Sequence, residues 1–152
     1  MKRRGQFYLV AGMVIISLII GIIAMVNYTK KSQTTIINDL KEELKVETQK
    51  VLENEASQGG DPMNQYGLDY SSHLGSEIEL YFITGINPNL EANKYVNGVS
   101  TSVTNDLTVD EDNNKIIFNL NGINHEFDLM PAENFYYLIL QEIKGESFVA
   151  TG

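Results

Sequence analysis

The segment from Phe7 to Val26 constrains this chain more than any other part of its sequence. It is an uninterrupted apolar run without a charged residue or a proline. As a helix it would be roughly 30 Å long, which is the thickness of the hydrocarbon core of a bilayer. A helix in a globular core normally keeps a polar face, and this run has none. The sequence therefore predicts a transmembrane helix over residues 7–26 rather than a buried core helix.

Basic residues on both sides of the run predict its orientation. Lys2, Arg3 and Arg4 precede it together with the α-amino group, whereas Lys30 and Lys31 follow it. Because positively charged flanks are retained in the cytoplasm, the N-terminal excess predicts a cytoplasmic N-terminus. The expected location is the cell membrane, crossed once, with the C-terminal domain extracellular.

The chain after the run is strongly acidic and contains no cysteine. The net charge is −9, and all 20 carboxylates follow residue 31, where only six lysines accompany them. Such a surface repels phosphate backbones, so nucleic acid is not an expected partner. The absence of cysteine excludes disulfides, thiolate metal sites and thiol nucleophiles, so the external domain must be held together by packing.

A second signal lies directly before the apolar run, where residues 2–7 read Lys-Arg-Arg-Gly-Gln-Phe. This basic leader closely resembles the class III signal peptide of archaeal type IV pilin-like proteins. The resemblance implies that a prepilin peptidase cuts between Gly5 and Gln6, with Arg3, Arg4 and Gly5 as recognition residues. An uncleaved signal anchor is the alternative.

The resemblance covers about the first 30 residues and departs from bacterial pilins at Val10. Bacterial pilins usually carry a glutamate at this position of the mature chain, where it pairs with the amino terminus of a neighbouring subunit. The run is also rich in isoleucine, which differs from a high-copy archaellum filament subunit. The resemblance therefore favours an archaeal pilin-like protein over a bacterial pilin.

The helix is expected to continue beyond the apolar run. Residues 32–55 lack glycine and proline, and their apolar side chains recur at helical spacing. Gly59, Gly60 and Pro62 break the pattern, and the segment up to Ser76, which is polar and contains Gly67 and Gly75, is expected to be a loop. The predicted organisation is a leader over 1–5, a long helix over 6–57 and an extracellular β-rich head over 58–152.

Strand signals follow in the head. Residues 77–84 alternate, Asn97-Gly98 can close a short hairpin, and residues 135–143 lead through Gly145-Glu146 into 147–151. The strongest hairpin signal is Asn121-Gly122 between residues 115–120 and 123–129. A two-residue turn there predicts three cross-strand pairs: Leu120 with Ile123, Phe118 with His125, and Ile116 with Phe127.

These elements predict an α+β fold that resembles the fold of type IV pilins. Its long N-terminal transmembrane helix would pack on one antiparallel sheet of about four to six strands in the C-terminal head. The long helix can cover the apolar face of that sheet. The strand order stays open.

Candidate chemistry is sparse. Asp110, Asp112 and Asn114 have the first spacings of a calcium loop, but Lys115 replaces the required glycine and Asn121 replaces the bidentate glutamate. A turn that uses local Asp and Asn hydrogen bonds explains the cluster better. It is therefore a weak metal candidate, and no metal or other cofactor is expected.

The two histidines give no enzyme signature. His73 lies next to Ser71 and Ser72, but the chain has no Gly-x-Ser-x-Gly nucleophile elbow and no His-Glu-x-x-His motif. His125 occupies an apolar position of the predicted hairpin, which favours a core or edge role. The six tyrosines of the head suit either an adhesion surface or ordinary sheet content. The chain is therefore not expected to be an enzyme.

The resulting expectation is a pilin-like cell-surface subunit, processed by a prepilin peptidase and embedded in membrane lipid. It would self-associate, or associate with related subunits, through residues 6–30 in a pilus or another adhesive surface structure. The alternative is an uncleaved, signal-anchored protein whose extracellular domain binds a ligand or partner. A membrane-tethered enzyme with a pocket around His73 is the third possibility.

Overall fold

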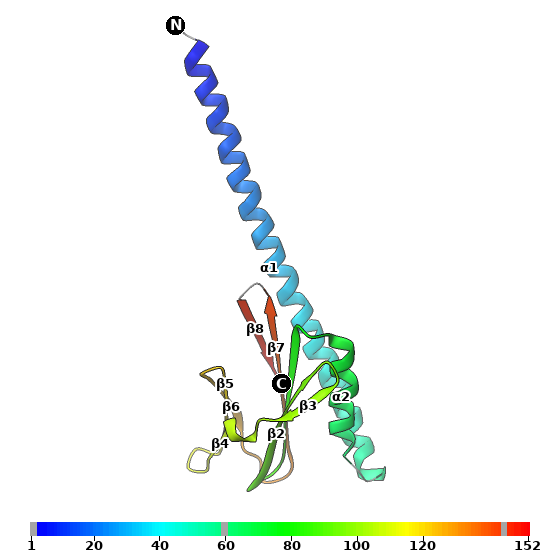
Figure 1. Ribbon diagram of the computed structural model, residues 1–152. Coiled ribbons are helices and arrows are strands. Elements are labelled where there is room, and N and C mark those ends of the chain that lie inside the picture. The colour runs from blue at the N-terminus through cyan, green and yellow to red at the C-terminus, as the bar shows by residue number, and fades with distance from the viewer. Residues whose placement is uncertain (1–2, 59–60, 144–145) are drawn as a thin grey trace. The chain divides into compact units, whose positions relative to one another are not determined.

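The computed structural model describes residues 3–58, 61–143 and 146–152 (Figure 1). These residues form two α-helices, one short 3-10 helix and eight β-strands. In chain order the elements are α1 (Arg3–Gln58), α2 (Pro62–Leu74), β1 (Ile78–Ile86), β2 (Asn89–Val96), β3 (Val99–Ser102), η1 (Thr104–Asp106), β4 (Leu107–Asp110), β5 (Lys115–Leu120), β6 (Ile123–Asp128), β7 (Asn134–Ile143) and β8 (Glu146–Thr151). The chain divides into two units, Met1–Ile36 and Ile37–Gly152, and all strands belong to the second.

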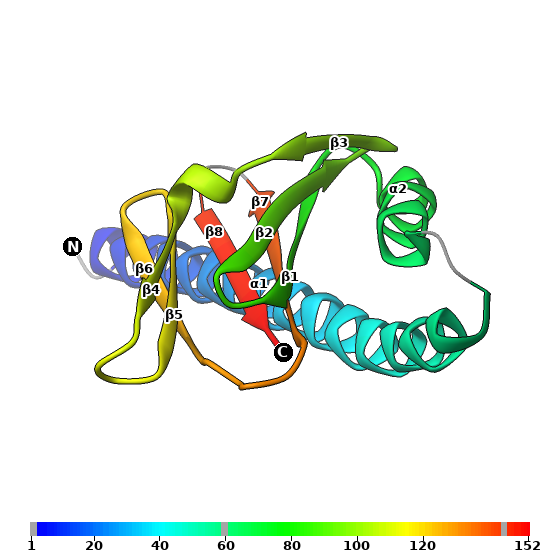
Figure 2. The same cartoon turned by 90° about the horizontal axis from the view of Figure 1, so that it is seen from below.

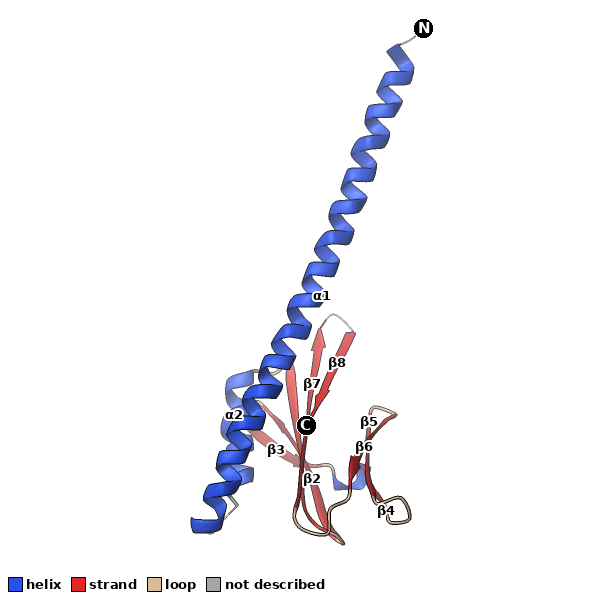
Figure 3. Ribbon diagram, turned by 180° about the vertical axis from the view of Figure 1, so that it is seen from behind, coloured by secondary structure: helices blue, strands red, loops and turns tan. Residues whose placement is uncertain are grey.

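The strands form two antiparallel sheets. The five-stranded sheet has the order β3-β2-β1-β7-β8, and the three-stranded sheet has the order β4-β5-β6. The central strand β1 pairs Leu80 with Tyr95 of β2 on one side and with Ile139 of β7 on the other. Figures 2 and 3 show α2 and the three-stranded sheet on opposite sides of the five-stranded sheet.

The five-stranded sheet is buried on its helix side by α2 and by the part of α1 that belongs to the second unit. Leu80 and Phe82 of β1 lie in one core with Ile37 and Leu44 of α1 and Met63 of α2. Leu44 and Leu80 are fully buried. The part of α1 that starts at Ile37 therefore packs as an ordinary amphipathic helix, with its apolar stripe on the sheet.

The opposite side of the same sheet is covered by the three-stranded sheet. Tyr81 and Ile83 of β1 share a second core with Ile116 and Phe118 of β5 and Leu138 of β7. Because successive side chains of a strand point to opposite faces, β1 supplies both cores. The second unit is thus a three-layer structure with the five-stranded sheet in the middle.

The hairpin prediction at Asn121-Gly122 is confirmed. The strands β5 and β6 pair in the predicted register, with Leu120 opposite Ile123, Phe118 opposite His125, and Ile116 opposite Phe127. Asn121 and Gly122 have φ values of 54° and 83°, the left-handed conformation that this two-residue turn requires. Asn97-Gly98 closes the β2–β3 hairpin with the same conformations.

The predicted loop between residues 62 and 76 is instead the helix α2. Asp61 caps its first turn, because the Asn64 amide donates to Asp61 Oδ1 at 3.0 Å, and Pro62 occupies the first helical position, where its missing N–H costs nothing. Gly67 had suggested a loop. In the structure its lack of a side chain admits the Tyr95 ring, since a Cβ atom there would lie 2.7 Å from ring carbons.

The predicted fold class, a long transmembrane helix on a single antiparallel sheet in the manner of type IV pilins, is wrong. The described strands form two sheets rather than one, and α2 shares the covering of the five-stranded sheet with α1. The physical reason lies in β1, where Tyr81 and Ile83 are as buried as Leu80 and Phe82. A strand with two buried faces needs a layer on each side.

The membrane prediction is corrected as well. In the part of the chain that the structure describes, no helix combines the length and the apolarity of a membrane span. The side chains described in the apolar run are those of residues 13–25, and those of residues 7–12 and of Val26 lie outside the description. This finding contradicts the transmembrane segment over 7–26 and the single-pass location with an extracellular domain.

Candidate functional site

The most unusual surface of the chain is the apolar stretch of α1, residues Met13 to Met25. Its large side chains between Met13 and Ile23 are each 52–64% exposed. They point to all sides of the helix, because ten of the eleven residues in this interval are exposed apolar or glycine residues and the eleventh is Ser17. A helix that is apolar all round is normally covered by a partner.

Small residues mark one side of this stretch. Ser17, Gly21 and Ala24 recur at the spacing that places side chains on the same helix face. The Ser17 hydroxyl donates to the Met13 carbonyl at 2.9 Å, so its polar group is satisfied within the helix. Apart from the adjoining helix backbone, no atom of the described residues lies within 4 Å of the position that a Cβ atom of Gly21 would take. This side of the helix can therefore approach another backbone closely.

The predicted processing residues lie at the start of the same helix. The helix α1 begins at Arg3 and includes Arg4, Gly5 and Gln6. The side chains of these four residues, together with all of Met1 and Lys2, lie outside what the structure describes. Cleavage between Gly5 and Gln6 stays a prediction.

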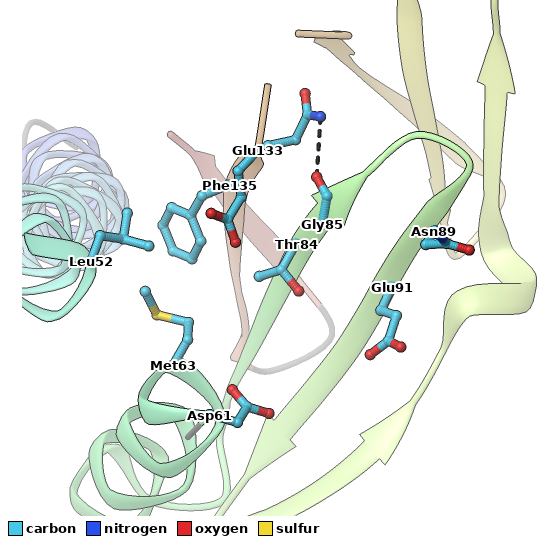
Figure 4. A pocket seen from close by; sticks show the side chains of 10 residues that line it. Leu52, Asp61, Met63, Thr84, Gly85, Asn89, Glu91, Glu133 and Phe135 are labelled. Carbon is cyan, nitrogen blue, oxygen red and sulfur yellow. Dashed lines mark hydrogen bonds between the residues drawn. The ribbon is translucent and has the colours of Figure 1, made fainter. Parts of the chain in front are cut away.

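A pocket of about 250 Å³ lies in the second unit, between the end of α1, the start of α2 and the strands β1, β2 and β7 (Figure 4). Leu52, Met63 and Phe135 form an apolar wall. The polar lining is Asp61, Thr84, Gly85, Asn89, Glu91, Glu133 and Asn134.

The rim of the pocket is held by the side chain of Asn134, which is 1% exposed. Its amide nitrogen donates to the carbonyls of Gly85, Met130 and Ala132 at 3.1–3.2 Å, and its oxygen accepts from the Met130 amide at 2.8 Å. The bond to Gly85 is the dashed line in Figure 4. One buried side chain thus ties the segment before β7 to the end of β1.

The pocket carries three carboxylates and, among its lining residues, no basic side chain. Asp61 comes from the start of α2, Glu91 from β2 and Glu133 from the segment before β7. Burial raises the pKa of the nearby Tyr95 phenol to about 12, and the charges of Asp61 and Glu91 add to this rise. Sequence reasoning missed this site, because its carboxylates are far apart in the chain and follow no motif.

The histidines do not assemble a triad in the described residues. The His73 ring donates from Nδ1 to the Asp69 carbonyl at 2.7 Å rather than to a carboxylate. Ser72 Oγ also donates to the Asp69 carbonyl, and Ser71 Oγ donates to the Leu68 carbonyl. His125 lies on β6 opposite Phe118, and its buried Nε2 has no hydrogen-bond partner among the described residues.

The weak calcium candidate is the turn between β4 and β5. Both carboxylate oxygens of Asp110 accept hydrogen bonds from Asn113, from its backbone at 3.1 Å and its side chain at 2.8 Å, and these bonds lower the pKa of Asp110. Asn114 has a φ of 52°, which its turn conformation requires. No group of three metal-binding side chains that includes Asp112 or its neighbours occurs among the residues described.

Comparisons with known protein families, with curated proteins and with solved structures find no match for this chain.

Proposed function

We propose that this protein is a non-catalytic assembly subunit. The apolar stretch of α1 associates with the same stretch in other copies or in related subunits, and the unit Ile37–Gly152 is the folded domain that each subunit carries. The observation that carries the proposal is the exposure of the large apolar side chains between Met13 and Ile23, each more than half exposed. Exposed apolar surface on this scale marks an interaction site.

The chemistry of the two units supports a division of roles. The apolar stretch has no ionisable side chain, so its association is driven by burial of apolar surface and is not opposed by charge. The second unit carries all 20 acidic residues, and their mutual repulsion keeps these domains soluble and apart. Association through α1 and separation of the acidic domains are therefore compatible.

The test is sedimentation equilibrium of the full chain with one charge placed on the apolar stretch. In Ile22→Glu a carboxylate must be desolvated on association, which costs several kcal/mol, so we expect particles of one chain. Ile123→Glu is the matched control, because Ile22 and Ile123 are 64% and 63% exposed and Ile123 lies in the second unit. This control should associate like the wild type.

Three results would contradict the proposal. A wild-type chain that sediments as a single chain has no self-associating surface, and equal dissociation by both substitutions would show a general charge effect. Uptake of the wild type by phosphatidylcholine vesicles without self-association would assign the stretch to lipid instead.

Processing of the N-terminus remains a separate proposal, supported by the basic leader that ends in Gly5. Co-expression with a prepilin peptidase should yield a chain that begins at Gln6, as N-terminal sequencing would show. Gly5→Leu should keep Met1, because a bulky residue at the cut hinders the approach of the peptidase to the backbone. A Gly5→Leu chain that still begins at Gln6 would refute the assigned recognition residue.

A further inference from the structure

We propose that the pocket lined by Asp61, Glu91 and Glu133 binds an organic cation with an aliphatic stem, either an alkylammonium or an alkylguanidinium group. This inference goes beyond the assembly role, because none of the pocket residues belongs to the apolar stretch of α1. It rests on three features of the pocket: unpaired charge, an apolar wall and a fixed rim.

The charge argument comes from the partners of the carboxylates. Elsewhere in the second unit, Glu47, Glu79 and Asp128 each accept a hydrogen bond from a lysine at 2.6–2.9 Å. Glu91 and Glu133 make no ion pair with the described residues, and Asp61 uses only Oδ1, to cap α2. These three carboxylates are exposed and line one opening that has no basic side chain, so a cation bound there would supply the charge partner that they lack among the described residues.

The apolar wall specifies the rest of the ligand. Leu52, Met63 and Phe135 face the same opening as the carboxylates (Figure 4). The methylene groups of a lysine-like or arginine-like chain pack on such a wall while their charged end remains at the carboxylates. A volume of about 250 Å³ is below that of most pockets for drug-sized ligands and suits one such chain.

The rim is fixed before any ligand binds. The side-chain oxygen and nitrogen of Asn134 both form hydrogen bonds with backbone groups, so the segment that carries Glu133 is attached to the end of β1. Asp61 is held by its bond to the Asn64 amide. Preorganised groups lose little conformational entropy when a ligand binds, which favours a specific site over a diffuse acidic surface.

A bare metal ion fits this pocket less well. No group of three His, Cys, Asp or Glu side chains in the described part of the chain is arranged to hold a metal ion. The carboxylates surround an opening with an apolar side, whereas divalent ions such as Ca²⁺ need six to eight oxygen ligands at 2.3–2.6 Å. An organic cation uses the charge and the apolar wall together.

The experiment is calorimetric titration of the full-length protein with hexane-1,6-diammonium. Hexane-1,6-diol has the same stem without charge, and Mg²⁺ has charge without a stem. We expect saturable binding of the diammonium ion and no saturable binding of the other two. Removal of two carboxylates in Glu91→Gln/Glu133→Gln should weaken binding about tenfold or more, because a hydrogen bond to a charged group contributes about 1.5–3 kcal/mol.

The matched control is Glu126→Gln/Glu142→Gln, which removes the same charge from exposed residues of β6 and β7 that do not line the pocket. It should change the dissociation constant less than about twofold, since exposed charges at a distance are screened by salt. Equal weakening by both double variants would overturn the proposal, as would binding of Mg²⁺ or of the diol at the same site.

The source of the cation is distinguished by a second ligand. The tripeptide Gly-Lys-Gly, blocked at both ends, offers the same ammonium group as a side chain. Competition between the peptide and the diammonium ion, with tighter binding of the peptide, assigns the pocket to a basic side chain of a partner protein. Tighter binding of the diammonium ion assigns it to a free amine. Failure of both ligands refutes the site without affecting the assembly proposal, which is tested by Ile22→Glu.

Discussion

Two stretches of the same helix use apolar residues in opposite ways. Between Met13 and Met25, α1 exposes its large apolar side chains on all sides. Between Ile37 and Leu52, it buries one stripe and leaves the other side polar, with Leu44 fully buried and Glu43 exposed. Apolar content alone therefore does not say what a helix packs against.

The pattern around the helix carries that information instead. A one-sided stripe can be satisfied by a single sheet of the same chain, as in the second unit. An apolar surface on all sides cannot be satisfied by one neighbour and requires several partners. The comparison predicts that substitutions in the two stretches change different properties, folding in one and association in the other.

The largest effect on folding is expected for Leu44→Ala. Leu44 is fully buried, and its truncation leaves a cavity that costs about 3 kcal/mol of unfolding free energy. Ile19→Ala is the counterpart, because Ile19 is 52% exposed and its truncation should change the stability by less than about 0.5 kcal/mol. Urea unfolding followed by tyrosine fluorescence measures both, since the chain has no tryptophan. Equal losses would contradict the distinction between the stretches.

Two glycines test the same difference between a packed and an exposed position, with smaller expected effects. Gly67→Ala places a Cβ atom 2.7 Å from the buried Tyr95 ring, and such overpacking should cost about 2 kcal/mol. Gly21→Ala meets no atom within 4 Å and should leave the fold intact or strengthen the helix by up to about 1 kcal/mol. The added methyl group should instead weaken association measured by sedimentation. A Gly21→Ala chain that associates as tightly as the wild type would show that close approach at Gly21 is not used.

The alkaline limb of stability, the loss of stability at high pH, should depend on buried tyrosines of the second unit. Burial raises the pKa of Tyr70 from 10.0 to about 12, and the charges of Glu43 and Glu47 on α1 add to this rise. A raised pKa in the folded state means that the stabilisation is complete below pH 10 and is lost as the pH rises to about 12. Urea unfolding between pH 8 and pH 12 should show this loss.

The matching variant for the alkaline limb is Tyr70→Phe. The buried hydroxyl of Tyr70 has no hydrogen-bond partner among the described residues, so its removal should reduce the unfolding free energy little at pH 7. The variant should then lose less stability above pH 10 than the wild type. The remaining loss belongs to other buried phenols such as Tyr66, whose pKa is also raised by burial. An unchanged alkaline limb would contradict the assignment to Tyr70.

Local features of this fold could be predicted from the sequence, and long-range ones could not. The β5–β6 register followed from Asn121-Gly122, because a two-residue turn fixes which residues face each other. The assignment of strands to two sheets depends on contacts between residues far apart in the chain, and alternation within β1 does not reveal that both of its faces are covered.

The missed helix and the missed pocket have different causes. The start of α2 is visible in the sequence, since Asp61 followed by Pro62 is a helix start signal, but Gly67 within the segment favours a loop. The role of Gly67 becomes visible only with the Tyr95 ring against it. The pocket residues Glu91 and Glu133 have no such local signal, because only the folding of β1, β2 and β7 brings them to one opening.

The smallest predicted effect concerns the polar side of the packed stretch of α1. Lys50 Nζ donates to Glu47 Oε1 at 2.9 Å, and both side chains are well exposed. Such a pair contributes about 0.2–0.5 kcal/mol, and salt screens it. Lys50→Gln should therefore reduce the unfolding free energy by no more than about 0.5 kcal/mol at low salt, with no difference from the wild type at 1 M NaCl. A larger loss that does not depend on salt would show that this side of the helix also makes packing contacts. The packed stretch would then not have a purely polar side, and its contrast with Met13–Met25 would be weaker.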